Sequence, residues 1–109
     1  MEYILLEETP FEKIYRNSAW KAFQYFLCNS DILSNEKYKN VYNELLNYFI
    51  KRRKVQFNLN NFDSAEIISL AKKEYYSFVH NRNFTKKDIE NFVENYNQYK
   101  NLLVIRPKK

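Results

Sequence analysis

The segment "KRRKVQFNLN", residues 51–60, decides how the middle of the chain is expected to fold. It opens with four consecutive cations, and in the rest of it Val55, Phe57 and Leu59 alternate with polar residues. Alternation with a period of two is typical of a half-buried strand, so we predict a strand over residues 55–59. The cations would then close a preceding helix, where positive charge offsets the partial negative charge of the helix C-terminus.

Two helices are predicted upstream of this segment. "TPFEKIYRNSAWKAFQYFLCN" begins with a capping box from Thr9 to Glu12 and has Pro10 at the first helical position. Apolar residues then recur at spacings of three and four, which predicts a helix from about residue 10 to 28. After "NSDILSN" a second apolar stripe begins, and it predicts a helix that Ser34 caps and that ends near Arg52.

Two further helices and a strand are predicted downstream. Asp63 and Glu66 form a variant of the capping box before a third apolar stripe, which extends to Val79. "HNRNF" is a turn by composition, and Thr85 then caps a fourth helix with Asp88 at its third position. "LLVIRPKK" contains a predicted strand at 102–106, which we expect to pair antiparallel with 55–59. Residues 2–6 are a candidate for one more strand.

The predicted fold class is α+β, mainly α, with about four helices and a small antiparallel sheet in a single domain. From residue 34 onward the order is helix, strand, helix, helix, strand. That order resembles the winged-helix domains, and the resemblance implies a winged-helix-like core at 34–109 with residues 1–33 as an N-terminal helical extension. A length of 109 residues suits one compact domain.

Composition argues against most enzymatic chemistry. The chain has no Gly and only one Cys and one His, which excludes glycine-rich phosphate loops and nucleophile elbows. Cys28 and His80 are a possible thiol–imidazole pair, but a core cysteine and a helix-end histidine explain them more simply. We therefore expect no catalysis, no cofactor and no metal. A lone cysteine and the lack of an apolar run of roughly 20 residues favour a cytoplasmic protein.

The positive charge is concentrated in two short segments. The chain has 18 basic and 13 acidic residues, a net charge of +5. Seven of the basic residues lie at 51–54 and 106–109, and the remaining 11 face the 13 acidic residues, a balance of −2. If strands 55–59 and 102–106 pair, both segments meet at one end of the sheet. Such crowding destabilises a compact fold unless a polyanion or counterions occupy it.

These observations lead to a prediction of non-catalytic DNA binding, on double-stranded DNA, by a regulator or accessory protein of plasmid or phage type, with a homodimer as the default assembly. The predicted phosphate contacts are Lys51, Arg52, Arg53, Lys54, Arg106, Lys108 and Lys109, with Lys86, Lys87 and Asn91 near the groove.

A second hypothesis is a small mobile-element protein that binds and inhibits, or adapts, a host or defence protein. Ten Tyr residues exceed what so small a core needs, and Tyr and Arg are typical of recognition surfaces. The partner would then present an acidic or nucleic-acid-binding surface to the cations.

Overall fold

A computed structural model describes residues 4–77 and 84–108 of the chain. These residues form four α-helices, α1 (Pro10–Cys28), α2 (Glu36–Gln56), α3 (Ser64–Ser77) and α4 (Lys86–Tyr99), and two short strands, β1 (Leu6–Glu7) and β2 (Arg106–Pro107). Short 3-10 helices, Ser30–Ser34 and Lys100–Leu102, follow α1 and α4. The expectation of a mainly helical domain with a small antiparallel sheet is thus confirmed.

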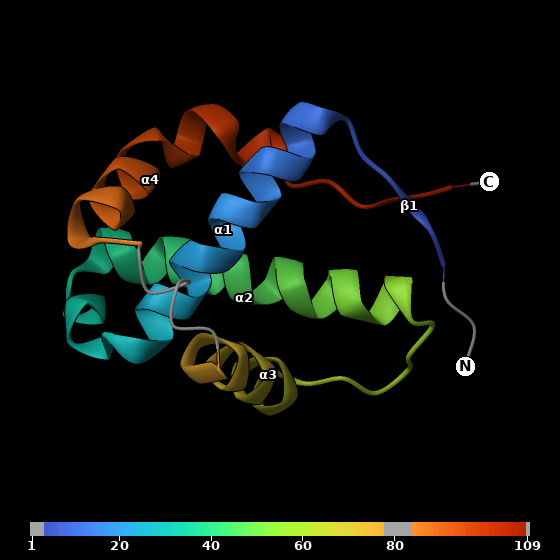
Figure 1. The fold of residues 1–109 in the computed structure, drawn as a ribbon, viewed down its shortest axis with the longest axis horizontal. Coiled ribbons are helices and arrows are strands. Elements are labelled where there is room, and N and C mark those ends of the chain that lie inside the picture. The colour runs from blue at the N-terminus through green and yellow to red at the C-terminus, as the bar shows by residue number, and fades with distance from the viewer. Residues whose placement is uncertain (1–3, 78–83, 109) are drawn as a thin grey trace.

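Helix α1 organises the packing. It crosses α2, with α3 on one side of the crossing and α4 on the other, and β1 and β2 run side by side near the end of α2 (Figure 1). Aromatic and aliphatic side chains from all four helices fill the centre, and full burial of each large one contributes about 1.5–3 kcal/mol. The buried core consists of Ala19, Ala22, Phe23, Phe26, Val41, Leu45, Phe49, Ile67, Ala71, Ile89, Phe92, Val93 and Tyr96.

The predicted helix starts are mostly confirmed. Thr9 and Glu12 form the capping box of α1, and Thr85 and Asp88 form that of α4. In each box, the side chain of each residue accepts a hydrogen bond from the backbone N–H of the other residue. The two bonds satisfy two donors that a helix start would otherwise leave unpaired. The cap of α2 was predicted wrongly: the side chain of Asn35, rather than that of Ser34, accepts from the first turn.

The predicted strand at 55–59 is wrong, because α2 continues through Gln56. The helix ends in a Schellman motif: the N–H of Leu59 donates to the carbonyl of Lys54 and the N–H of Asn58 donates to that of Val55. The motif needs a residue with positive φ, and Asn58 supplies it with φ of 52°. Asn tolerates this left-handed conformation better than most residues do. In a chain without Gly, an asparagine thus ends the helix.

The predicted strand at 102–106 and its pairing with 55–59 are wrong as well. Residues 100–102 form a 3-10 helix, and β2 begins only at Arg106. Its partner is β1, in an antiparallel register that pairs Leu6 with Pro107 and Glu7 with Arg106. Since no strand separates α2 from α3 in the described residues, the structure does not show the element order of a winged-helix domain.

No helix within residues 4–77 and 84–108 combines the length and the apolar character needed to cross a bilayer.

Candidate functional site

The predicted basic block lies on the last turns of α2. Lys51 is exposed, and Arg52, Arg53 and Lys54 are half-buried. The guanidinium of Arg53 lies over the ring of Phe57, 4.5 Å from its centroid, which is a cation–π contact. Because the block occupies a helix C-terminus, the helix dipole favours its charge whether or not a ligand is present.

The N-terminal segment brings the two basic segments together. The N–H of Ile4 donates to the carbonyl of Gln56 at the end of α2, at 2.6 Å. On the neighbouring residue, the carbonyl of Leu5 accepts from the N–H of Lys108, at 2.7 Å. The end of α2 and the C-terminal segment therefore meet at one end of the molecule, through Ile4 and Leu5 just before β1, rather than through the pairing predicted from the sequence. Lys109 lies outside the described residues.

Part of this positive charge is already neutralised by Glu8, which precedes α1. Arg16 donates two hydrogen bonds to its carboxylate, at 3.0 and 3.1 Å, and a guanidinium nitrogen of Arg52 lies 3.7 Å from it. Burial raises the pKa of Glu8, but the hydrogen bonds and charges of the two arginines outweigh that effect and leave the pKa below its ordinary value. Arg52 also donates to the hydroxyl of Tyr48, at 3.3 Å.

Arg106 is held by a second carboxylate, that of Glu12. Its guanidinium donates two hydrogen bonds to the buried Glu12 side chain, at 2.6 and 3.1 Å. These bonds, with the backbone N–H of Thr9, lower the pKa of Glu12 to about 2. Arg52 and Arg106, both predicted phosphate contacts, thus have structural partners. None of the ion pairs within residues 4–77 and 84–108 involves Lys51, Lys54 or Lys108.

The other predicted contacts do not join this surface. Lys86 and Lys87 open α4, and Asn91 follows one turn later; all three are exposed. The start of α4 lies at the end of the molecule opposite to the end of α2 (Figure 1). The structure therefore brings 51–54 and 106–108 together and leaves Lys86, Lys87 and Asn91 apart from them.

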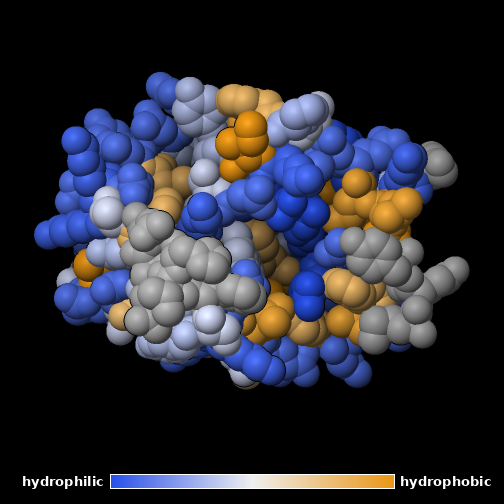
Figure 2. Space-filling model, in the orientation of Figure 1, coloured by the Kyte–Doolittle hydropathy of each residue, from blue (hydrophilic) through white to orange (hydrophobic). Residues whose placement is uncertain are grey.

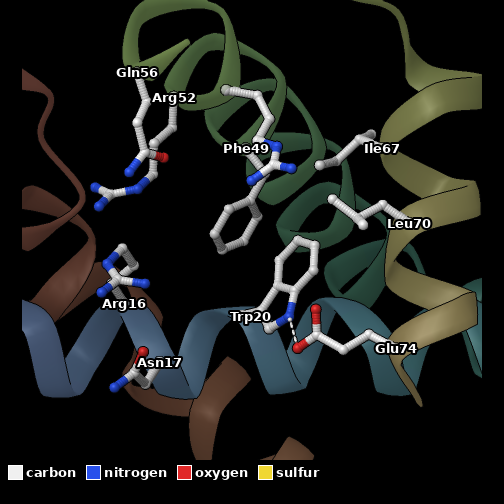
Figure 3. Close-up of a pocket in the computed structure, with 10 residues that line it drawn as sticks. Arg16, Asn17, Trp20, Phe49, Arg52, Gln56, Ile67, Leu70 and Glu74 are labelled. Carbon is white, nitrogen blue, oxygen red and sulfur yellow. Dashed lines mark hydrogen bonds between the residues drawn. The ribbon is translucent and has the colours of Figure 1, made fainter. Parts of the chain in front are cut away.

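A pocket of about 320 Å³ opens between α1, α2 and α3, beside the basic end of α2. Figure 3 shows Trp20 and Phe49 at its centre, Arg16 and Arg52 to one side, and Glu74 to the other. The indole N–H of Trp20 donates to the Glu74 carboxylate at 3.1 Å. This pocket was not predicted from the sequence, because nothing local in the sequence connects residues 20, 49 and 74.

A small apolar cluster is exposed on the other side of α1. Phe11 and Ile14 lie one turn apart there and are 58% and 65% exposed, and the ring of Phe11 lies edge-on to that of Tyr99, with centroids 6.2 Å apart. Figure 2 shows mostly hydrophilic side chains on the face it views, with apolar patches over the first half of α1 and near the chain ends. Exposed apolar side chains that adjoin one another are candidates for contacts with other proteins.

Cys28, expected in the core, is half-buried at the end of α1. His80, its hypothetical partner, lies outside the described residues, and so do Phe78 and Val79 of the predicted third apolar stripe.

Comparisons of the chain with protein-family models, with curated proteins and with solved structures find no match.

Proposed function

We propose that the protein binds double-stranded DNA without catalysis, as a regulator or accessory protein of plasmid or phage type. The observation that supports the proposal is the junction at Ile4 and Leu5, just before β1, which joins the basic end of α2 to the basic C-terminal segment through two backbone hydrogen bonds. Two segments about 50 residues apart in the sequence thereby present their cations on one end of the domain.

The lysines are the primary phosphate contacts in this proposal. Lys51, Lys54 and Lys108 form none of the ion pairs found within the described residues. Arg53 adds a fourth cation, whose guanidinium is held over Phe57. Phosphate contacts position a protein on DNA and carry no sequence information themselves, so this surface provides affinity and orientation.

The test is the salt dependence of duplex binding, measured by fluorescence anisotropy between about 50 and 200 mM salt. The double variant Lys51→Ala/Lys54→Ala should lower affinity on every sequence. It should also flatten the log–log slope by about 2, because each lost phosphate contact contributes about 0.9. Neither lysine has an ion pair within the described residues, so the fold should be retained.

The matched control is Lys37→Ala/Lys39→Ala. It removes the same charge from exposed positions on the first turns of the same helix. The control should bind nearly as well as the wild type. Equal losses in both double variants would assign the effect to net charge rather than to a site, and a wild type that binds no duplex at the lowest salt would overturn the proposal.

The exposed cluster of Phe11, Ile14 and Tyr99 favours a second candidate function, binding to a host or defence protein as an inhibitor or adaptor. Aromatic residues such as Phe and Tyr are enriched at the cores of protein interfaces. The variant Phe11→Ser/Ile14→Ser should abolish such binding without changing duplex affinity. The DNA proposal predicts that the same variant retains the function of the protein in cells.

A further inference from the structure

The pocket between α1, α2 and α3 has the size of a site for one small molecule. Its volume of about 320 Å³ lies near the lower end of the range of ligand sites, about 300–1,000 Å³. Figure 2 shows the face hollowed near its middle, where hydrophilic side chains border apolar ones. A ligand that fits must therefore be compact and must offer both apolar and polar groups to the pocket.

The middle of the pocket is apolar and aromatic. The rings of Trp20 and Phe49 pack edge to face with centroids 4.8 Å apart, and Ile67 and Leu70 of α3 approach from the opposite wall (Figure 3). Phe49 and Ile67 are themselves buried, so a flat ring would stack on the half-buried Trp20, with the half-buried Leu70 beside it. Stacking of a nucleobase on an aromatic side chain typically contributes about 1–3 kcal/mol.

One side of the pocket is cationic. Arg16 and Arg52 lie on that side, and Arg53 also lines the pocket. The carboxylate of Glu8, held by Arg16 and Arg52, offsets only one of these three charges. Guanidinium groups are the side chains best suited to phosphate, since they offer several donors in a planar array. Arg16 is already fixed by two hydrogen bonds, so part of the array is ordered before any ligand arrives.

The opposite side carries an acceptor. One oxygen of Glu74 accepts the indole N–H of Trp20, and a carboxylate has capacity for several more hydrogen bonds. A ligand spanning the pocket would therefore place an anion at the arginines, a flat ring in the middle and an N–H donor at Glu74. Glutamate accepts such a bond from the exocyclic amine of cytosine.

From this arrangement we infer that the pocket binds a nucleoside 5′-phosphate whose base carries an exocyclic amine. The phosphate lies at Arg16, Arg52 and Arg53, and the amine donates to Glu74. The same chemistry is offered by a free nucleotide and by the 5′-phosphorylated end of a single strand. The inference does not rest on duplex binding, because Lys51 and Lys54 are not among the residues that line the pocket.

The protein contains its own reporter, because Trp20 is the only tryptophan of the chain. Cytidine 5′-monophosphate should quench Trp20 fluorescence and should bind about tenfold more tightly than uridine 5′-monophosphate, which has a carbonyl oxygen where cytidine has the amine. A factor of ten is about 1.4 kcal/mol, close to the lower limit for one hydrogen bond to a charged group. Cytidine without phosphate and inorganic phosphate alone should each bind at least tenfold more weakly.

Glu74→Ala should remove the preference, lowering the affinity for the cytidine nucleotide to that for the uridine nucleotide. Glu94→Ala, which removes a carboxylate from the exposed face of α4, is the matched control and should leave both affinities unchanged. If Glu74→Ala fails to fold, the wild-type comparison of the two nucleotides still decides, with the NMR shift of the Trp20 indole N–H as a second readout.

Oligodeoxycytidine with and without a 5′-phosphate distinguishes the two sources of the ligand. Binding of only the phosphorylated strand assigns the pocket to strand ends, and binding of only the mononucleotide assigns it to a free nucleotide. Equal affinity for the cytidine and uridine nucleotides, or no response of Trp20 at millimolar nucleotide, would overturn the inference. Lys51→Ala/Lys54→Ala should retain nucleotide binding, so that failure of the pocket and failure of duplex binding are separate results.

Discussion

The hydroxyl of Tyr15 is the clearest target for a stability measurement. Its oxygen is buried and has no hydrogen-bond partner among the described residues, while its ring stacks on Phe92 with centroids 5.4 Å apart. Burial alone raises the pKa of this hydroxyl well above its ordinary value. Tyr15→Phe keeps the stacked ring and removes the unpaired group.

Leaving a buried polar group unpaired costs about 1–3 kcal/mol. The Tyr15 ring is itself half-buried, so we expect a gain near the lower limit, about 1 kcal/mol. In a domain of this size that gain corresponds to a rise of about 4 °C in Tm. Urea denaturation followed by circular dichroism should show a higher midpoint with an unchanged m-value, since the surface exposed on unfolding stays the same.

Tyr96→Phe is the matched control, because the Tyr96 hydroxyl does have a partner, the Glu44 carboxylate at 3.4 Å. Its removal should destabilise the protein by about 0.5–1.5 kcal/mol. The two variants thus remove the same atom and should shift the midpoint in opposite directions. A loss of stability in Tyr15→Phe would show that the hydroxyl makes a bond in solution and would refute the reasoning.

Three further outcomes are expected. The pKa of Glu12 is lowered to about 2 in the folded protein, so the ionised carboxylate stabilises the fold fully above its ordinary pKa of 4.5 and progressively less as the pH falls towards 2. Glu12→Gln should therefore flatten the dependence of stability on pH over that window, and an unchanged acid-unfolding profile would contradict the role of Arg106. Leu45→Ala should cost about 2–5 kcal/mol in urea denaturation because Leu45 is fully buried, whereas Leu46→Ala, at the half-buried neighbouring position, should cost clearly less. Asn58→Val should cost about 1–2 kcal/mol at a φ of 52°, and Asn58→Gly should cost nothing; equal effects would contradict the helix-end motif.

The helices were predictable from the sequence because their signals are local. A capping box spans four residues, and an apolar stripe repeats within one turn. The roles of Thr9 with Glu12, and of Thr85 with Asp88, could therefore be predicted from a few neighbouring residues.

The strands were not predictable in the same way, because a strand exists only with a partner. Val55, Phe57 and Leu59 alternate as a strand would, but the carbonyls of Lys54 and Val55 are satisfied within the helix end. No sequence pattern shows that β1, near the start of the chain, would pair with β2 at its end. The same limit applies to Glu8 and Glu12, whose arginine partners are identified only once α1 is placed against α2 and β2.

The arginines and the lysines of the basic segments have different roles, because α1 lies against the end of α2 and against β2. Glu8 and Glu12 flank the start of α1, and each binds an arginine in a two-bond fork, a geometry that lysine cannot reproduce. Arg106 thereby ties the C-terminal strand to α1, and Arg52 lies close enough to Glu8 to tie the end of α2 to the same region. The fold thus uses two of the arginines of its basic segments to assemble this end of the molecule, while Lys51, Lys54 and Lys108 add charge without such partners. Binding of an anion by these unpaired lysines costs little free energy, because no ion pair within the fold has to break and the backbone that carries them is already ordered.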